Sequence, residues 1–377
     1  MGVLKSYLEG KGIIMNARTR LLLSIGIPIL LIIVIVGAVF WQRRAASSGT
    51  TTTTHVTPGS QCSSLKPSAT QKLTPMSLAL DWTPNTNHTG IYVALAQHWY
   101  QAEGIDLKIL PYSSSVSPDV LVSNGKADVG ISSTEGIVAD AAVNQPVVSI
   151  AAIIQHNTSA LVTLASSGLS RPAMLDGKIY GAFGAPYETA VVSEIIQKDG
   201  GKGNFRSVTL DVDAMQALES HRIDFVWVFE GWEVIQANRS GVKLNVFPIT
   251  NYGVADYYTP NLITSPTEMK QKSALLHNFM TATSCGYEYA RIHAHDAAQM
   301  LLDQNKGALP DPGLVFASQD YLSPRYADAG RKWGLQDGAA WHGYPQFMLN
   351  SNRIDDASGK PVHSMNFDAL YTNQFLG

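Results

Sequence analysis

Residues 81–90 read DWTPNTNHTG, and they join two segments with different hydrophobic patterns. Residues 76–80 alternate as a short strand does, and a helical face after the loop is predicted by Ile91, Ala94, Leu95 and Trp99. In an open α/β sheet, small molecules bind in the crevice at the carboxyl ends of the strands. The loop brings a carboxylate, an indole, carboxamides and an imidazole to that place without Lys or Arg. This chemistry favours a flat polar heterocycle over an anion.

The rest of the chain continues the alternation of strands and helices. Further predicted strands are residues 107–110, 127–132, 147–154, 178–183, 208–212 and 224–229. Helical patterns lie between most of them, and the alternation restarts after Ser166. Such alternation is typical of mostly parallel sheets with helices on both faces.

The length of the chain, 377 residues, suits two lobes of ordinary size. We predict an α/β fold of two lobes joined by crossings near residues 163–168 and 258–264. The predicted lobe 1 comprises residues 76–165 and 263–377, and the predicted lobe 2 comprises residues 166–262. A clamshell of this kind closes around a ligand by hinge rotation.

The N-terminal region has a different character. Residues 21–41 form an uncharged apolar run, which as a helix would span the ~30 Å hydrocarbon core of a bilayer. Basic residues before it favour residues 1–20 on the cytoplasmic side. We therefore predict a single-pass signal anchor in the cell membrane, with a cleaved signal peptide as the alternative and Met15 as an alternative start. Residues 42–75 are rich in Ser and Thr and are predicted to be a flexible linker to an extracytoplasmic binding domain.

Short segments spread over residues 76–377 resemble, in order, those of solute-binding proteins that deliver thiamine-pyrimidine precursors to ABC importers. Besides residues 81–90, they are 155–159 (QHNTS), 184–189 (GAPYET), 230–233 (EGWE), 257–260 (YYTP) and 372–376 (TNQFL). The resemblance implies a periplasmic-binding-protein-like fold of type II. It also implies an ABC permease as partner and an aminopyrimidine as ligand.

The candidate ligand-binding residues follow predicted strands or lie near the crossings. From the 81–90 loop they are Asp81, Trp82, Asn85, Asn87 and His88, and further along the chain Glu135, Asn157, Tyr187, Glu188, Glu230 and Trp232. Trp82 suits stacking on a flat ring, and the resemblance supports Tyr187, Glu188, Glu230 and Trp232. Other readings stay open: Asn85, Asn87 and His88 are residue types that shape turns, and the helix dipole alone stabilises a glutamate such as Glu188 in a first turn.

Two alternatives share the predicted fold. A flavin such as riboflavin would also fit an aromatic cleft. The related pyridoxal-phosphate-dependent pyrimidine synthases carry a lysine after the third strand, but here Gly130-Ile131 precedes Ser132, and residues 254–258 replace the cysteine-rich run of those enzymes. We therefore expect no enzyme activity, no catalytic residues and no cofactor. A sensor ectodomain is disfavoured because about 20 cytoplasmic residues are too few for an output domain.

Composition limits the remaining classes of function. Charged residues make up 15% and the net charge is −3, so no basic field for nucleic acid is expected. His293 and His295 are two residues apart, which is poor spacing for a metal on a helix, and no metal site is predicted. Cys62 and Cys285 are either a disulfide or two unrelated thiols. We expect a monomer.

Overall fold

The computed structural model describes residues 62–68, 70–185, 187–210, 214–350 and 354–377. The predicted membrane segment, residues 21–41, and the linker up to residue 61 lie outside this part of the chain. Within it, no helix has both the length and the apolar character that crossing a membrane requires. The membrane anchor therefore stays a prediction.

The first sheet has the strand order β2-β1-β3-β10-β4. Its strands are β1 (Thr74–Ala79), β2 (Ile105–Leu110), β3 (Val129–Ser132), β4 (Val148–Ala152) and β10 (Asn261–Thr264). β1 runs parallel to β2 and β3, whereas β10 is antiparallel to both of its neighbours. The helices that connect these strands are α3 (Thr89–Ala96), α4 (Trp99–Ala102), α5 (Pro118–Ser123) and α6 (Thr134–Ala142). We call the body built on this sheet lobe 1.

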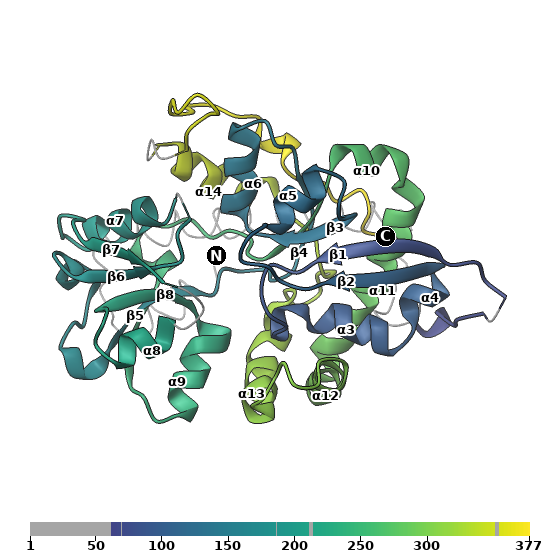
Figure 1. Ribbon diagram of the computed structural model, residues 1–377, viewed down its shortest axis with the longest axis horizontal. Helices are drawn as coiled ribbons and strands as arrows, with labels where there is room; N and C mark the ends of the chain where they lie inside the picture. Colours follow the sequence, from purple (N-terminus) through teal and green to yellow (C-terminus); the bar gives the residue numbers. More distant parts are fainter. Residues whose placement is uncertain (1–61, 69, 186, 211–213, 351–353) are drawn as a thin grey trace, which may run out of the picture. The chain divides into compact units, whose positions relative to one another are not determined.

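The second sheet has the order β7-β6-β8-β5-β9 and forms lobe 2 (Figure 1). Its strands are β5 (Ser159–Leu164), β6 (Ile179–Ala182), β7 (Arg206–Thr209), β8 (Phe225–Phe229) and β9 (Leu244–Pro248). The helical elements of lobe 2 are α7 (Glu188–Lys198), α8 (Ala214–Glu219), the short π-helix η5 (Glu230–Val234) and α9 (Ile235–Arg239). The predicted α/β architecture with two sheets is confirmed, but the expectation of mostly parallel sheets is wrong. β5 is antiparallel to both of its neighbours, as β10 is in lobe 1, so both sheets are mixed.

The first crossing between the lobes comes earlier than predicted. β5 pairs with β8 and β9 of the second sheet, so the chain leaves lobe 1 between Ala152 and Ser159 rather than near residues 163–168. The return lies between Pro248 and Asn261, slightly before the predicted boundary of 262/263. β5 is buried along its whole length, and such a continuous buried run fits either sheet equally well.

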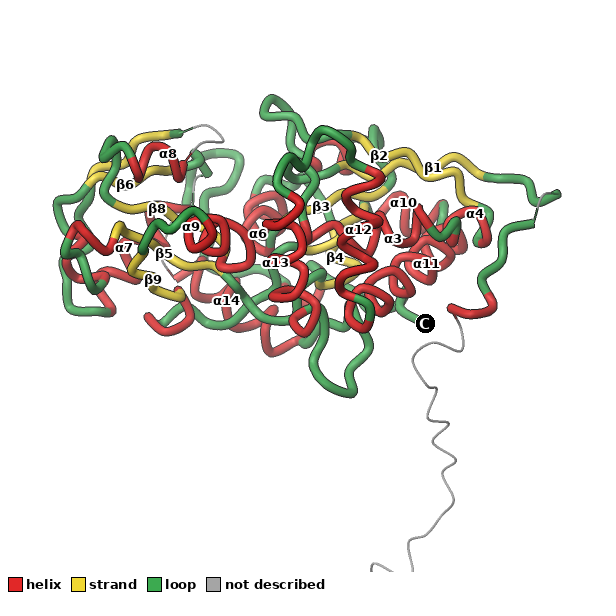
Figure 2. Tube along the Cα trace, turned by 90° about the horizontal axis from the view of Figure 1, so that it is seen from below, coloured by secondary structure: helices red, strands yellow, loops and turns green. Residues whose placement is uncertain are grey.

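The C-terminal helices belong mainly to lobe 1. They are α10 (Pro266–Gln271), α11 (Ser273–Ile292), α12 (Ala294–Gln304), α13 (Pro312–Leu322) and α14 (Gly338–Asn350). Figure 2 shows α11 beside α3, and the two backbones meet at Gly90 and Gly286. A Cβ atom at Gly286 would lie 1.8 Å from the carbonyl oxygen of Gly90, so only glycine fits there. This contact holds the helix that follows the 81–90 loop.

Cys62 and Cys285 form a disulfide, which resolves the question left open by the sequence. Cys62 begins a short 3₁₀ helix, Cys62–Ser64, and Cys285 lies within α11. Cys62 lies within the predicted linker, residues 42–75, which is thus attached covalently to lobe 1, and β1 begins at Thr74 inside the predicted linker.

Candidate functional site

The 81–90 loop is held together by its own side chains. His88 is fully buried, and its Nδ1 accepts a hydrogen bond from the backbone N–H of Asn85 at 3.3 Å. The other ring nitrogen, Nε2, therefore carries the proton and donates to Asp81 Oδ1 at 2.9 Å. Asn85 caps the turn by accepting from the backbone N–H of Asn87 at 2.9 Å. Asn85 and His88 thus shape the loop, which was the alternative interpretation of these residues.

Trp82 is the side chain of this loop that leaves an aromatic face available. It is partly exposed and packs on Tyr112, with ring centroids 4.8 Å apart. Asn87 is held by its backbone, because its carbonyl accepts a hydrogen bond from Tyr287 Oη at 2.7 Å. The loop is therefore a rigid support that presents Trp82.

Glu135 is the most unusual polar group in the described part of the chain. It lies in the first turn of α6 and only 3% of it is exposed. Its Oε1 accepts hydrogen bonds from Tyr257 and Tyr344, the latter at 3.1 Å. Its Oε2 is buried and has no partner at hydrogen-bond geometry among the described residues, while the side chain of Ser133 lies close enough to lower the pKa of this carboxyl group. Burial raises the pKa of the Glu135 carboxyl above its usual value.

Tyr187 brings lobe 2 to this carboxyl group. Burial, and next the nearby charge of Glu135, raise the pKa of Tyr187 well above its ordinary value. A hydrogen bond with the Ser133 side chain, at the start of α6, acts in the opposite direction. Tyr187 also packs against the apolar cluster that contains Tyr257 and Tyr344. Glu135 and Tyr187, predicted site residues from the two lobes, are therefore close enough for the charge of one to act on the other.

Two further carboxyl groups lie close to this group. Burial raises the pKa of Asp119, whose Oδ1 accepts a hydrogen bond from Ser132, and the charge of Asp81 raises it further. Burial and the charge of Asp119 raise the pKa of Asp140. The charge of Asp119 in turn acts on Tyr187. The surroundings of Glu135 and Tyr187 are thus acidic and phenolic, a setting that suits a ligand rich in hydrogen-bond donors.

Glu188 serves its own loop. Its carboxylate accepts hydrogen bonds from the backbone N–H groups of Phe183, Gly184 and Ala185 at 2.7–3.1 Å and from Tyr180 Oη at 2.9 Å. Burial outweighs these hydrogen bonds and raises its pKa. With both oxygens occupied, Glu188 orders the segment that carries Tyr187.

Glu230 and Trp232 lie at a different contact between the lobes. Glu230 Oε2 accepts from Tyr321 Oη of α13 at 3.3 Å, and Ser318 of the same helix donates to the carbonyl of Gly231. Trp232 packs against an apolar cluster of lobe 1 that includes Leu301 and Val315. Among the described residues, no hydrogen bond or ring contact joins Glu230 or Trp232 to Glu135, and their membership of the site stays a prediction.

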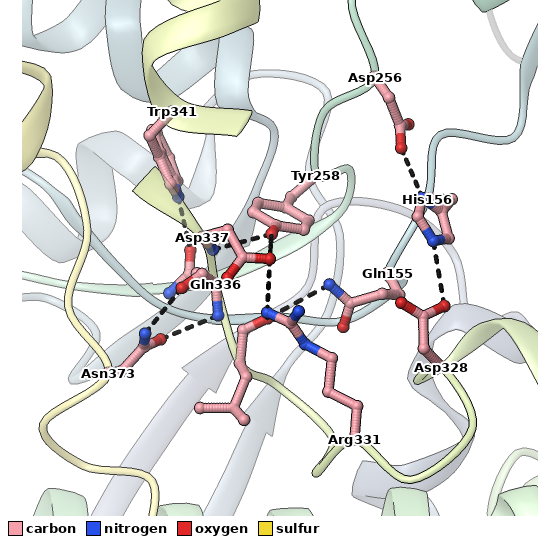
Figure 3. Close-up of polar contacts among 11 residues, drawn as sticks. Gln155, His156, Asp256, Tyr258, Asp328, Arg331, Gln336, Asp337, Trp341 and Asn373 are labelled. Carbon is pink, nitrogen blue, oxygen red and sulfur yellow. Dashed lines mark hydrogen bonds and ion pairs between the residues drawn. The ribbon is translucent and has the colours of Figure 1, made fainter. Parts of the chain in front are cut away.

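Asn157 lies on the first crossing. Its Oδ1 accepts from the backbone N–H of Ser159 at 2.7 Å, and its own N–H donates to Asp256 of the second crossing at 2.9 Å. Its Nδ2 is buried without a partner among the described residues. Figure 3 shows the ring of the preceding residue, His156, between the carboxylates of Asp256 and Asp328. The two crossings are thus tied to each other and to lobe 1.

An open depression of about 760 Å³ adjoins this network, away from Glu135. It is lined by residues 328–332, 335–337 and Asn373. Of its basic side chains, Arg331 is paired with Asp337 at 2.7 Å, and Lys332 donates to the carbonyl of Gly377. Asn373 donates to the carbonyl of Gln336 at 2.8 Å (Figure 3). Because these polar groups bind one another, the depression offers few free partners to a ligand, and Glu135, Tyr187 and Trp82 stay the candidate residues.

Comparison with known proteins identifies the family of this chain. Residues 85–297 match the family described as NMT1/THI5 like. The chain belongs to the NMT1/THI5-like family. The formylaminopyrimidine-binding protein of Halalkalibacterium halodurans is 24% identical over 289 residues, which cover 75% of this chain and 87% of that protein. A putative thiamine biosynthesis protein of Haemophilus influenzae is 23% identical, and the match covers 68% of this chain and 83% of that protein.

Solved structures confirm the periplasmic-binding-protein-like fold. A Bordetella bronchiseptica protein matches with a TM-score of 0.62 at 17% identity, covering 80% of this chain and 95% of that one. The alkanesulfonate-binding protein SsuA of Xanthomonas axonopodis matches with a TM-score of 0.59 at 11% identity, covering 80% of this chain and 99% of that one. At these identities the likeness concerns the fold alone.

Some NMT1/THI5-like relatives are enzymes. A 4-amino-5-hydroxymethyl-2-methylpyrimidine phosphate synthase of Legionella pneumophila is 25% identical, with 68% of this chain and 83% of that protein covered. In the present chain the position after Gly130-Ile131 is Ser132, whose hydroxyl donates to Asp119. A serine cannot form a Schiff base.

The sequence interpretation missed several residues of this group, namely Tyr112, Asp119, Asp140, Tyr257 and Tyr344. Asp119 and Asp140 occur in ordinary amphipathic helices, and nothing in their spacing sets them apart. Tyr257 lies in a segment quoted for the family resemblance, which was a usable signal. Tyr344 comes from α14, more than two hundred residues from Glu135, and only the fold brings them together.

Proposed function

We propose that this NMT1/THI5-like protein is the solute-binding component of an ABC importer and that its ligand is an aminopyrimidine precursor of thiamine. The observation that carries the proposal is Glu135, a buried carboxyl group with an unpartnered oxygen next to Tyr187 of the other lobe. A buried acceptor without a partner is costly, and a ligand N–H group removes that cost.

The chemistry around Glu135 supports a donor-bearing ring. The exocyclic amine of an aminopyrimidine matches a free carboxylate oxygen, and its flat face matches the aromatic rings of Trp82 and Tyr187. An anionic ligand is disfavoured because the 81–90 loop contributes the carboxyl group of Asp81 and contains no Lys or Arg to bind an anion. The name of the Halalkalibacterium relative points to the same class of ligand.

Delivery to a permease completes the proposal. Residues 21–41 would anchor the protein in the cell membrane, and the linker up to Cys62 would hold the binding domain on the extracytoplasmic side. The disulfide at Cys62 then makes lobe 1 the tethered lobe, which leaves lobe 2 free to move. The protein itself carries out no chemistry in this role.

A thermal-shift screen of the full-length chain tests this function. The panel holds formylaminopyrimidine, hydroxymethylpyrimidine, thiamine and riboflavin, with nitrate and an alkanesulfonate as anion controls. A ligand at a hundredfold its Kd adds ~2.7 kcal/mol of apparent stability. We expect a shift with the aminopyrimidines. A shift with riboflavin alone would keep uptake but change the ligand, and a shift with an anion alone would overturn the proposal.

A further inference from the structure

We propose that Ser318 of α13 is a positioning residue for ligand capture. It links the 81–90 loop of lobe 1 to η5 of lobe 2, and this link favours the arrangement in which the two lobes are closed on each other. We call the three residues Thr86, Ser318 and Gly231 the loop relay. The proposal rests on the proposed role in solute capture, but it holds for any ligand that binds between the lobes.

The loop relay is a directed pair of hydrogen bonds. The Ser318 hydroxyl donates its one proton to the carbonyl oxygen of Gly231. Its Oγ lies 2.5 Å from Oγ1 of Thr86, so the Thr86 hydroxyl is the donor in this second hydrogen bond. All three residues are buried while the lobes are in contact. An alanine in place of Ser318 would leave the Gly231 carbonyl without a partner in the closed arrangement, whereas opening of the lobes would let water reach it.

Further contacts hold η5 and α9 against α13, and Figure 2 shows α9 beside this helix. Arg239 at the end of α9 pairs with Asp311, which caps the start of α13, at 3.1 Å. Gly313 makes room for the guanidinium group, because a Cβ atom there would lie 2.1 Å from Nη2 of Arg239. Nearer the other end of α13, Tyr321 donates to Glu230 at 3.3 Å. Along α13 the loop relay lies between these two contacts, so lobe 2 is held over the length of this helix.

These contacts form only when the lobes are closed. Their residues lie outside the two crossings, residues 153–158 and 249–260, so rotation of lobe 2 about the crossings separates η5 from α13. A contact of this kind raises the closed fraction of the free protein. The apparent Kd equals the intrinsic Kd divided by the fraction that is competent to bind, so the loop relay should strengthen ligand binding without touching the ligand.

The loop relay differs from the other contacts because it includes the 81–90 loop. The backbone carbonyl of Thr86 accepts a hydrogen bond from the Tyr326 hydroxyl at 2.5 Å, and the Thr89 hydroxyl donates to Gln319 of α13 at 2.6 Å. The loop is thus fastened to the helix that holds lobe 2. The position of the loop and the closure of the lobes therefore depend on each other through the loop relay.

Energy transfer between two fluorescent dyes, one on each lobe, tests the proposal in the full-length protein. The dyes are attached through p-acetylphenylalanine at Lys126 of lobe 1 and Glu219 of lobe 2, which are exposed, so the disulfide stays intact. We expect Ser318→Ala to shift the transfer efficiency of the free protein away from that of the wild type, and saturating formylaminopyrimidine to bring the two values together. The Kd of the variant for formylaminopyrimidine, measured by calorimetry, should be about fivefold weaker.

Two arginine variants separate closure from general effects on folding. Arg239→Gln removes the ion pair with Asp311 of lobe 1 and should shift the transfer efficiency in the same direction, by a smaller amount because both side chains are exposed. Arg171→Gln is the matched control, since Arg171 pairs with Asp199 inside lobe 2, and it should leave the efficiency unchanged. An unchanged efficiency in Ser318→Ala, or an equal shift in Arg171→Gln, would overturn the proposal. Absence of formylaminopyrimidine binding would instead contradict the proposed function, because the free proteins are compared without a ligand.

A double-mutant cycle tests the part played by the 81–90 loop. Thr86→Val keeps the size of the side chain and removes the hydroxyl of the loop relay, while the backbone carbonyl at this position stays bonded to Tyr326. If the loop relay acts as a unit, the combination of Thr86→Val and Ser318→Ala should change the open-to-closed ratio by less than the product of the two single changes. A change equal to that product would overturn the link between the loop and lobe 2.

Discussion

His156 on the first crossing and Asp256 on the second are joined by a hydrogen bond, so the two segments that connect the lobes are linked side chain to side chain. The opposite ring nitrogen of His156 binds Asp328 of lobe 1 at 3.0 Å. An imidazole that binds carboxylates through both nitrogens donates from both, which requires the protonated ring. The charge state of one histidine therefore affects the hinge.

The first prediction concerns pH. The hydrogen bond with Asp256, followed by the charges of Asp256 and Asp328, raises the pKa of His156 above that of the unfolded chain, about 6.5. A group whose pKa is raised on folding stabilises the folded state. This contribution is complete at pH values below the pKa of the unfolded chain, and it is lost as the pH rises through the pKa of the folded state. The three side chains are about half exposed, so the effect should be small.

We therefore expect His156→Gln to lower the Tm at pH 5.5 and to leave it unchanged at pH 9. Thermal unfolding at both pH values measures this difference, with His221→Gln as a control at an exposed position of lobe 2. A deficit of equal size at both pH values would mean that packing, not charge, is responsible.

The second prediction concerns the disulfide. Cys62 and Cys285 are 223 residues apart in sequence, and a cross-link across a long loop restricts the unfolded chain. Replacing both cysteines by serine should lower the free energy of unfolding by about 2–4 kcal/mol. Urea denaturation measures the loss, and reduction of the wild type by dithiothreitol should reproduce it. Ligand affinity should remain as it was, because neither cysteine contacts the candidate site.

The third prediction concerns Glu188. Glu188→Ala would leave three backbone N–H groups and the Tyr180 hydroxyl without their acceptor. The expected cost is about 1–3 kcal/mol of stability, since unpaired buried donors are expensive. The affinity for formylaminopyrimidine should survive, because both oxygens of Glu188 already accept hydrogen bonds from the chain. If this affinity disappears while stability holds, Glu188 is a ligand contact after all.

The fourth prediction concerns the contact between α3 and α11. Gly286→Ala would place a methyl group against the carbonyl of Gly90, and overpacking of this kind costs typically 1–3 kcal/mol, or somewhat more. Gly343→Ala in α14 is the matched control, because its nearest neighbour would be 3.6 Å away. That variant should be neutral or slightly stabilising, by at most about 1 kcal/mol. Denaturant titration of both variants tests the difference.

The hydrophobic patterns predicted the strands and the two sheets well, because alternation and buried runs are local properties. The place of β5 was not predictable in this way, since SALVTL is buried on both faces and either sheet could take it. The candidate site also has a part that the sequence predicts and a part that depends on the fold. Trp82 and Glu135 follow strands, so the sequence could nominate them, whereas the hydrogen bond between Glu135 and Tyr344 depends on how α14 packs on α6.

The roles of Asn85, His88 and Glu188 show a second limit. Their residue types suit both ligand binding and turn formation, and only the hydrogen-bond partners distinguish the two. In the structure the partners are backbone groups and Asp81, so these three residues build the loops that carry Trp82 and Tyr187.

Calorimetric titration of the full-length protein with formylaminopyrimidine, compared with Trp82→Ala, tests the central claim most directly. We expect binding of one ligand per chain, weakened about tenfold in the variant through loss of aromatic stacking, with little change in the Tm of the free protein. No binding to the wild type, together with heat released on adding nitrate or an alkanesulfonate, would contradict the assignment of an aminopyrimidine site.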